Sequence, residues 1–184
     1  MIYRFLILSD EIDNFSREIE IDSSATFLDL NNAILDAVGY TNDLITSFFN
    51  CSHGWRKQEE ITLIEMDTNP DVDSFVMDTT YLDEFTKDEG DKLIYVFDNF
   101  ADRSFFVELK EINGGNLDRA KCTKKEGKAP KQLTSEDEFL LNPTATPQTD
   151  NIEIDYYGDD AYDLDDLDEN GFSDIGLDEL SEIY

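Results

Sequence analysis

Apolar and polar residues alternate near the N-terminus in a pattern typical of β-strands. Residues 2–9 mix β-branched, aromatic and aliphatic side chains over the length of one strand. Residues 15–21 alternate more strictly, which places Arg17, Ile19 and Ile21 on one face and polar side chains on the other. A period of two residues indicates a strand with one buried face. Because a short polar segment separates the two runs, the pattern predicts an antiparallel hairpin.

The periodicity becomes helical after this hairpin. Between Phe27 and Val38, apolar side chains recur every three or four residues, which gives a helix one apolar face. Thr26 precedes this run in the N-cap position, and Asp29 places negative charge where the helix dipole favours it. Gly39 follows the run and is suited to end a helix. We therefore predict one helix over this segment.

About four further strands are predicted downstream. Residues 46–51 form a short aromatic run and residues 61–66 an apolar one, while residues 92–97 and 103–112 are stronger strand candidates. Residues 80–85 have the pattern of a single helical turn. The order of elements favours an α+β fold in which one helix packs on a mixed sheet.

Charge divides the chain into three parts. The 44 acidic and 14 basic residues give a net charge of −30. Residues 150–184 contain 14 acids and no base, whereas residues 119–131 contain six bases and one acid. We therefore predict a core domain over residues 1–115, a basic extension with a Pro-containing linker over residues 116–149, and an acidic, flexible segment over residues 150–184, called here the acidic tail.

The acidic composition excludes some partners. Direct binding to nucleic acid depends on cationic side chains that neutralise phosphates, so we do not expect it of the intact chain. Adhesion to an anionic membrane surface is disfavoured for the same reason. No apolar run approaches the roughly 18 residues of a membrane span, and residues 5–8 are too short for the core of a signal peptide. We expect a soluble, cytoplasmic protein.

Three motifs occur in a fixed order over about the first 132 residues. Residues 26–40 read T-F-L-D-L-N-N-A-I and end in G-Y, residues 90–98 read G-D-K-L-I-Y-V-F-D, and residues 122–130 contain Cys, Gly and Ala-Pro. This series resembles the plasmid Ri open-reading-frame-three-like family of uncharacterised bacterial proteins, some of them linked to mobile elements. The resemblance implies a compact α+β domain, with a β-grasp-like plan as the expected arrangement, and no particular activity.

The chain departs from the family at positions where the family motif carries His or Trp. Asn31 stands where the helix motif has His, and residues 44–46 (Leu-Ile-Thr) stand where the family has His-x-His. Arg103 and Phe105 replace a strand Trp and His. The resemblance therefore implies that titratable or metal-binding chemistry at these positions is missing from this chain.

One short segment contains residue types that could carry catalysis. Cys51 and His53 occupy alternate positions, so an extended chain would place both on one face as a thiolate–imidazolium pair, with Trp55 beside them. The simpler interpretation is a loop histidine and a semi-buried, reduced thiol. Together with Cys122 the pair would supply only three ligands, fewer than a structural zinc site uses. No metal or cofactor is therefore predicted.

Bulky apolar side chains are interleaved with the acids of the acidic tail. A wholly solvated tail, which is the competing interpretation, gains nothing from them. One group alternates as an added β-strand would, and another falls on one helical face. These groups are Ile152, Ile154 and Tyr156, and Leu177, Leu180 and Tyr184, respectively. The pattern predicts a protein partner whose surface is basic, with apolar pockets between the charges.

The same chain contains one basic surface of this kind. It includes Lys121, Lys124, Lys125 and Lys128, and a linker of about 18 residues would allow the acidic tail to fold back on it. The sequence thus favours a non-enzymatic protein-interaction module whose tail engages either residues 119–131 or an external basic partner. The alternatives are an enzyme or small-ligand binder with a pocket near Cys51, His53 and Trp55, and a nucleic-acid mimic.

Overall fold

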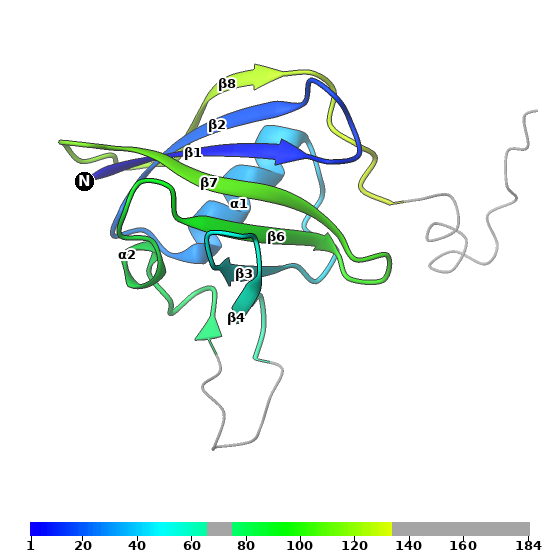
Figure 1. The fold of residues 1–184 in the computed structure, drawn as a ribbon, viewed down its shortest axis with the longest axis horizontal. Helices are drawn as coiled ribbons and strands as arrows, with labels where there is room; N and C mark the ends of the chain where they lie inside the picture. The colour runs from blue at the N-terminus through cyan, green and yellow to red at the C-terminus, as the bar shows by residue number, and fades with distance from the viewer. Residues whose placement is uncertain (66–74, 134–184) are drawn as a thin grey trace, which may run out of the picture. The chain divides into compact units, whose positions relative to one another are not determined.

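Eight strands form one mixed sheet in the computed structural model, which describes residues 1–65 and 75–133 (Figure 1). The strands are β1 (Ile2–Ser9), β2 (Ser16–Asp22), β3 (Ser47–Cys51), β4 (Lys57–Thr62), β5 (Phe75–Val76), β6 (Lys92–Asp98), β7 (Arg103–Asn113) and β8 (Lys121–Glu126). Their order across the sheet is β5-β4-β3-β6-β7-β1-β2-β8, and every neighbouring pair is antiparallel except β4–β5. The predicted α+β class is confirmed.

The main helix, α1 (Phe27–Val38), covers one face of this sheet (Figure 1). Its predicted bounds are confirmed, and so are its ends. Thr26 and Asp29 form a reciprocal capping box, and Gly39 adopts a left-handed conformation with φ of 78°. Because both ends are defined by local hydrogen bonds, the helix can present a continuous apolar face to the sheet.

Buried side chains recur at every second position along β1 and β2, and they form the part of the sheet that faces α1. In the antiparallel register Phe5 lies opposite Ile19 and Ile7 opposite Arg17, and all four side chains are buried. The predicted hairpin is therefore confirmed. A second helix, α2 (Leu82–Phe85), is the short helical turn expected from the sequence.

An aromatic cluster fills the space between α1 and the sheet. Phe105 on β7 is fully buried, and its ring centroid lies 4.6 Å from that of Phe97 and 5.2 Å from that of Phe15. Tyr40 and Tyr95 stack on the same ring at 6.1 and 6.4 Å. Such ring pairs stabilise a core beyond the area that they bury.

Two strands lie where the hydrophobic pattern did not place them. The strand expected at residues 61–66 corresponds to β4, which begins earlier, at Lys57. The first four side chains of β4 are exposed, so the hydrophobic pattern did not indicate them. The segment expected to be a basic extension supplies β8, so the sheet continues beyond residue 115. Neither strand shows an alternating pattern, because most side chains on both of their faces are exposed and polar or charged.

The buried guanidinium of Arg17 connects the helix to two strands. Its Nε donates to the Ala37 carbonyl at the end of α1 at 3.1 Å. Its Nη atoms donate to the carbonyls of Ser16, Glu126 and Gly127 at 2.7, 2.5 and 3.1 Å. Among the described residues no carboxylate lies within ion-pair distance of this group. Backbone carbonyls, one of them at the negative end of a helix, therefore compensate the buried charge.

Near Arg17, the backbone after β8 approaches the turn between β1 and β2 closely. Gly127 has a φ of +64°, and a Cβ at this position would lie 2.5 Å from the Asn14 carbonyl oxygen. No other residue type fits there without moving the turn between β1 and β2. The glycine thus allows the end of β8 to reach Arg17.

We predict that Arg17→Met lowers the free energy of unfolding by about 3 kcal/mol or more, because it leaves buried carbonyl groups without donors. Urea denaturation monitored by circular dichroism measures the change. Arg56→Met is the matched control, since Arg56 is exposed, and it should alter stability by less than about 0.5 kcal/mol. Equal losses in the two variants would contradict a structural role for the buried guanidinium.

Candidate functional site

The three sequence motifs serve mainly to hold the fold together. The Tyr40 hydroxyl, at the end of the first motif, donates to the Pro130 carbonyl at the end of the third at 2.7 Å. In the second motif the Asp91 carboxylate accepts hydrogen bonds from the backbone N–H groups of Lys87 and Asp88 at 2.8 and 3.0 Å. These residues of the motifs therefore connect separate segments of the fold.

A neutral polar cluster lies buried between α1 and the sheet. Asn31 is fully buried, and its Oδ1 accepts hydrogen bonds from Thr46 Oγ1 at 2.9 Å and from the Tyr95 hydroxyl at 2.7 Å. Burial raises the pKa of Tyr95 far above its ordinary value, so the phenol remains a donor. Residues 31 and 46, two positions at which the family motif has His, are thus in direct contact, which the sequence analysis did not predict.

Arg103 and Phe105, the strand positions at which the chain differs from the family motif, lie apart from the contact between Asn31 and Thr46. Phe105 belongs to the aromatic core described above. Arg103 forms two hydrogen bonds to the Glu11 carboxylate at 2.8 and 2.9 Å and donates to the Lys131 carbonyl at 2.7 Å. Arg103 therefore ties β7 to the segments on either side of it.

A cavity of about 500 Å³ lies beside the buried polar cluster, where β3 begins and β6 ends. We call it the β3 cavity. Its walls come from three separate segments: Asp43, Leu44, Ile45, Thr46 and Ser47; Glu60 and Thr62; and Asp98, Asn99 and Phe100. This site could not be predicted from the sequence, because the three segments share no motif. The only local signal was an aromatic residue, Phe100, in a polar turn.

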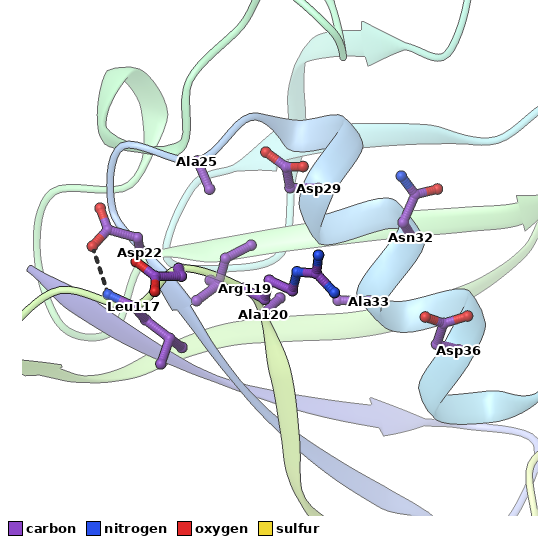
Figure 2. Close-up of a pocket in the computed structure, with 11 residues that line it drawn as sticks. Asp22, Ala25, Asp29, Asn32, Ala33, Asp36, Leu117, Arg119 and Ala120 are labelled. Atoms are coloured by element: carbon purple, nitrogen blue, oxygen red, sulfur yellow. Dashed lines mark hydrogen bonds between the residues drawn. The ribbon is translucent and has the colours of Figure 1, made fainter.

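A smaller groove of about 250 Å³ lies between α1 and residues 117–120 (Figure 2). Four aspartates and Arg119 are among its lining residues. Two of the carboxylates have local structural roles. Hydrogen bonds from Ser24 lower the pKa of Asp22, which also accepts from the Leu117 N–H at 3.2 Å, and Asp29 belongs to the capping box. Asp22 and Asp29 thus serve to end β2 and to begin α1, respectively.

The predicted Cys51–His53 pair is not arranged for catalysis. Cys51 is buried at the end of β3, and burial raises the pKa of its thiol. Its Sγ lies 3.5 Å from the Phe49 carbonyl, whereas His53 is exposed in the following turn. A thiol of raised pKa is less nucleophilic at neutral pH than an ordinary cysteine. Cys51 and Cys122 are both free thiols.

The face of the sheet opposite α1 carries a second apolar cluster, called here the outer patch. It consists of the buried residues Cys51, Ile94 and Val96 with the partly buried rings of Phe49, Trp55 and Phe106. Lys92 Nζ lies 4.8 Å from the centre of the Trp55 ring, and Lys57 Nζ lies 4.6 Å from that of Phe49. Within residues 1–65 and 75–133, no helix covers these side chains.

The basic residues predicted to bind the acidic tail lie on and after β8. Lys121 pairs with Glu20 at 2.9 Å, and Lys124 lies 3.8 Å from Glu18 and 3.2 Å from Glu126. Lys125 and Lys128 are exposed. The tail residues predicted to bind a partner, from Ile152 to Tyr184, lie outside the described residues. The structure therefore shows part of this basic surface already engaged by carboxylates of the sheet.

Metal-ligating residue types do not gather in the described part of the chain. There, no group of three or more His, Cys, Asp or Glu side chains is placed to hold a metal ion. None of the helices in the same ranges is long and apolar enough to cross a membrane.

These features define an α+β protein in which a single main helix covers one face of an eight-stranded mixed sheet and the other face bears an apolar patch. The chain belongs to the plasmid pRiA4b ORF-3-like protein family, whose sequence model matches residues 2–170. The membership expected from the three motifs is thus confirmed.

A solved structure has a similar fold. It is the crystal structure of a protein of unknown function from Methanosarcina mazei Go1, which is 18% identical and superimposes with a TM-score of 0.54. The match covers 67% of this chain and 68% of that one. No curated protein matches this chain. The likeness supports the fold alone.

We predict that iodoacetamide modifies Cys122 faster than Cys51 in the folded protein, because Cys51 is buried and its thiol has a raised pKa. Mass spectrometry of tryptic peptides over a time course at neutral pH measures both rates. In urea the two rates should converge. If Cys51 is modified faster than a free cysteine, the prediction is wrong and Cys51 is an activated nucleophile.

Proposed function

We propose that this protein is a non-enzymatic protein-interaction module that binds its partner through the outer patch. The observation that carries the proposal is an apolar cluster on the sheet face opposite α1, outside the main core. Three of its residues are buried, and the rings of Phe49, Trp55 and Phe106 remain partly exposed. Partly exposed apolar side chains that gather on a sheet face are typical of protein–protein contact sites. Aromatic residues of the kind found here are also enriched at the centres of such interfaces.

The two halves of this sheet face differ in charge pairing. On β1, β2 and β8, charged residues neutralise one another in pairs such as Arg4–Glu18 and Lys121–Glu20. On β3, β6 and β7 the outer patch is apolar, and the ammonium group of Lys92 donates to the His53 carbonyl at 2.8 Å. A suitable partner presents apolar side chains to the patch and a carboxylate opposite Lys92. The charged half adds little affinity, since its charges already have partners.

The acidic tail provides a second proposed contact, with a basic surface. Because Lys121 and Lys124 already pair with Glu20, Glu18 and Glu126, residues 119–131 offer less positive charge than the sequence suggests. This favours an external basic protein over the tail's own chain as the target. Attraction between such charges weakens as salt increases.

The alternative functions receive less support from the described residues. An enzyme built on Cys51 and His53 would need an activated thiol, and the pKa of Cys51 is raised instead. A nucleic-acid mimic needs a rigid face of unpaired acids, whereas Glu18 and Glu20 on the sheet are paired with basic side chains.

Affinity capture from a native lysate, followed by purification of the captured protein and measurement of Kd, tests the proposal. We predict that Phe106→Thr weakens binding at least about tenfold, because it removes one of the three partly exposed rings of the patch. Lys92→Gln should weaken binding by a smaller factor. Lys110→Gln is the matched control, since Lys110 lies outside the patch and pairs with Glu108.

Deletion of residues 150–184 separates the two proposed contacts. It should reduce affinity at low salt and have less effect at high salt. The proposal fails if no protein is captured specifically, or if Phe106→Thr binds as tightly as the unmodified chain. Free energies of unfolding for each variant show whether a loss of binding reflects a loss of folding.

A further inference from the structure

Two buried polar atoms without hydrogen-bond partners belong to residues that line the β3 cavity. In the described part of the chain there are four such side-chain atoms: Arg4 Nε, Asn31 Nδ2, Ser47 Oγ and Asp98 Oδ2. Ser47 and Asp98 line the cavity, and Asn31 is hydrogen-bonded to Thr46, which also lines it. Buried polar atoms are normally paired, so two such atoms in the lining of one cavity call for a physical explanation.

The cavity mouth carries large apolar side chains that the fold leaves in contact with solvent. Phe100 is 80% exposed and Ile45 is 46% exposed. Together with Leu44 they give the cavity an apolar lining. A volume of about 500 Å³ falls within the roughly 300–1,000 Å³ typical of sites for small molecules. The shape and lining therefore suit a compact apolar ligand.

The charged residues of the lining indicate which polar group such a ligand carries. Asp43, Glu60 and Asp98 supply three carboxylates, and none of the ten lining residues is basic. Asp98 Oδ1 accepts hydrogen bonds from the N–H groups of Phe100 and Ala101 at 3.0 and 3.3 Å. The nearest cation to Asp98 Oδ2 is Arg103, at 3.7 Å. That guanidinium forms its shorter bonds with Glu11.

We propose that the β3 cavity binds a small apolar molecule that carries a primary amine. The apolar part packs against Leu44, Ile45 and Phe100. The ammonium group, which has three donors and no acceptor, is directed toward Ser47 and Asp98. An anionic ligand is disfavoured by the three carboxylates of the lining. This site is separate from the outer patch and does not depend on the proposed interaction function.

Titration of the full chain with phenethylamine, followed by NMR of the backbone amides, tests the proposal. Phenethyl alcohol and hydrocinnamate are the matched neutral and anionic probes. At physiological salt, which weakens general attraction to the acidic chain, phenethylamine should shift the amides of residues 44–47 and 98–100. It should bind at least about tenfold more tightly than the alcohol, and hydrocinnamate should bind most weakly.

Variants of the cavity sharpen the test. Asp98→Asn keeps an oxygen for the two backbone N–H groups but removes the charge, so the preference for the amine should fall about tenfold while alcohol binding is unchanged. Asp13→Asn, which removes an exposed carboxylate elsewhere, should change neither affinity. Phe100→Ala should weaken amine and alcohol alike; its ring is exposed, so this variant remains informative if Asp98→Asn does not fold.

Several results would overturn the proposal. These are equal affinity for the three probes, preference for hydrocinnamate, shifts confined to other residues, and absence of binding by every probe at millimolar concentration. An unchanged amine preference in folded Asp98→Asn would overturn it as well. None of these outcomes bears on partner capture through the outer patch, so the two proposals can fail independently.

Discussion

The structure depends on a buried positive charge that is compensated by backbone carbonyls. Arg17 receives no carboxylate partner among the described residues, so its charge depends on backbone carbonyls, three of which belong to the end of α1 and the end of β8. Charged groups are costly to bury unless they are well hydrogen-bonded. The guanidinium thus makes helix docking and the addition of the eighth strand parts of one cooperative event. Gly127 is required at the same point because no side chain fits against Asn14.

Local signals allowed much of the fold to be predicted from the sequence. Helix α1 carries its own capping box and terminal glycine, and β1 and β2 alternate because one face is buried. The strand β8 could not be predicted in this way. It is an edge strand whose side chains are mostly exposed, and its lysines pair across the sheet with glutamates from β2. The sequence shows such a segment only as a run of charge. The β3 cavity was equally hidden, since its walls come from three segments that meet only in the folded protein.

The outer patch and the β3 cavity occupy successive positions on the same two strands. Along β3, Ser47 lines the cavity, and Phe49 and Cys51 belong to the patch. Along β6, Asp98 lines the cavity, and Val96 and Ile94 belong to the patch. Side chains two positions apart in a regular strand share a face of the sheet, as Ser47 and Phe49 do on β3. On β6 the register with β7 shifts between Val96 and Asp98. The two proposed sites therefore lie on neighbouring parts of β3 and β6, while the opposite face of the sheet is occupied by α1.

The position of β8 also has a consequence for solubility. In the described part of the chain it is the last strand of the sheet, so one side of its backbone has no neighbouring strand. An open strand edge can pair with the edge of another molecule and begin aggregation. Lysine side chains oppose such pairing, because two like edges bring their charges together and the ammonium groups must remain hydrated. The lysines of β8 are therefore the feature that opposes edge-to-edge pairing at this side of the sheet.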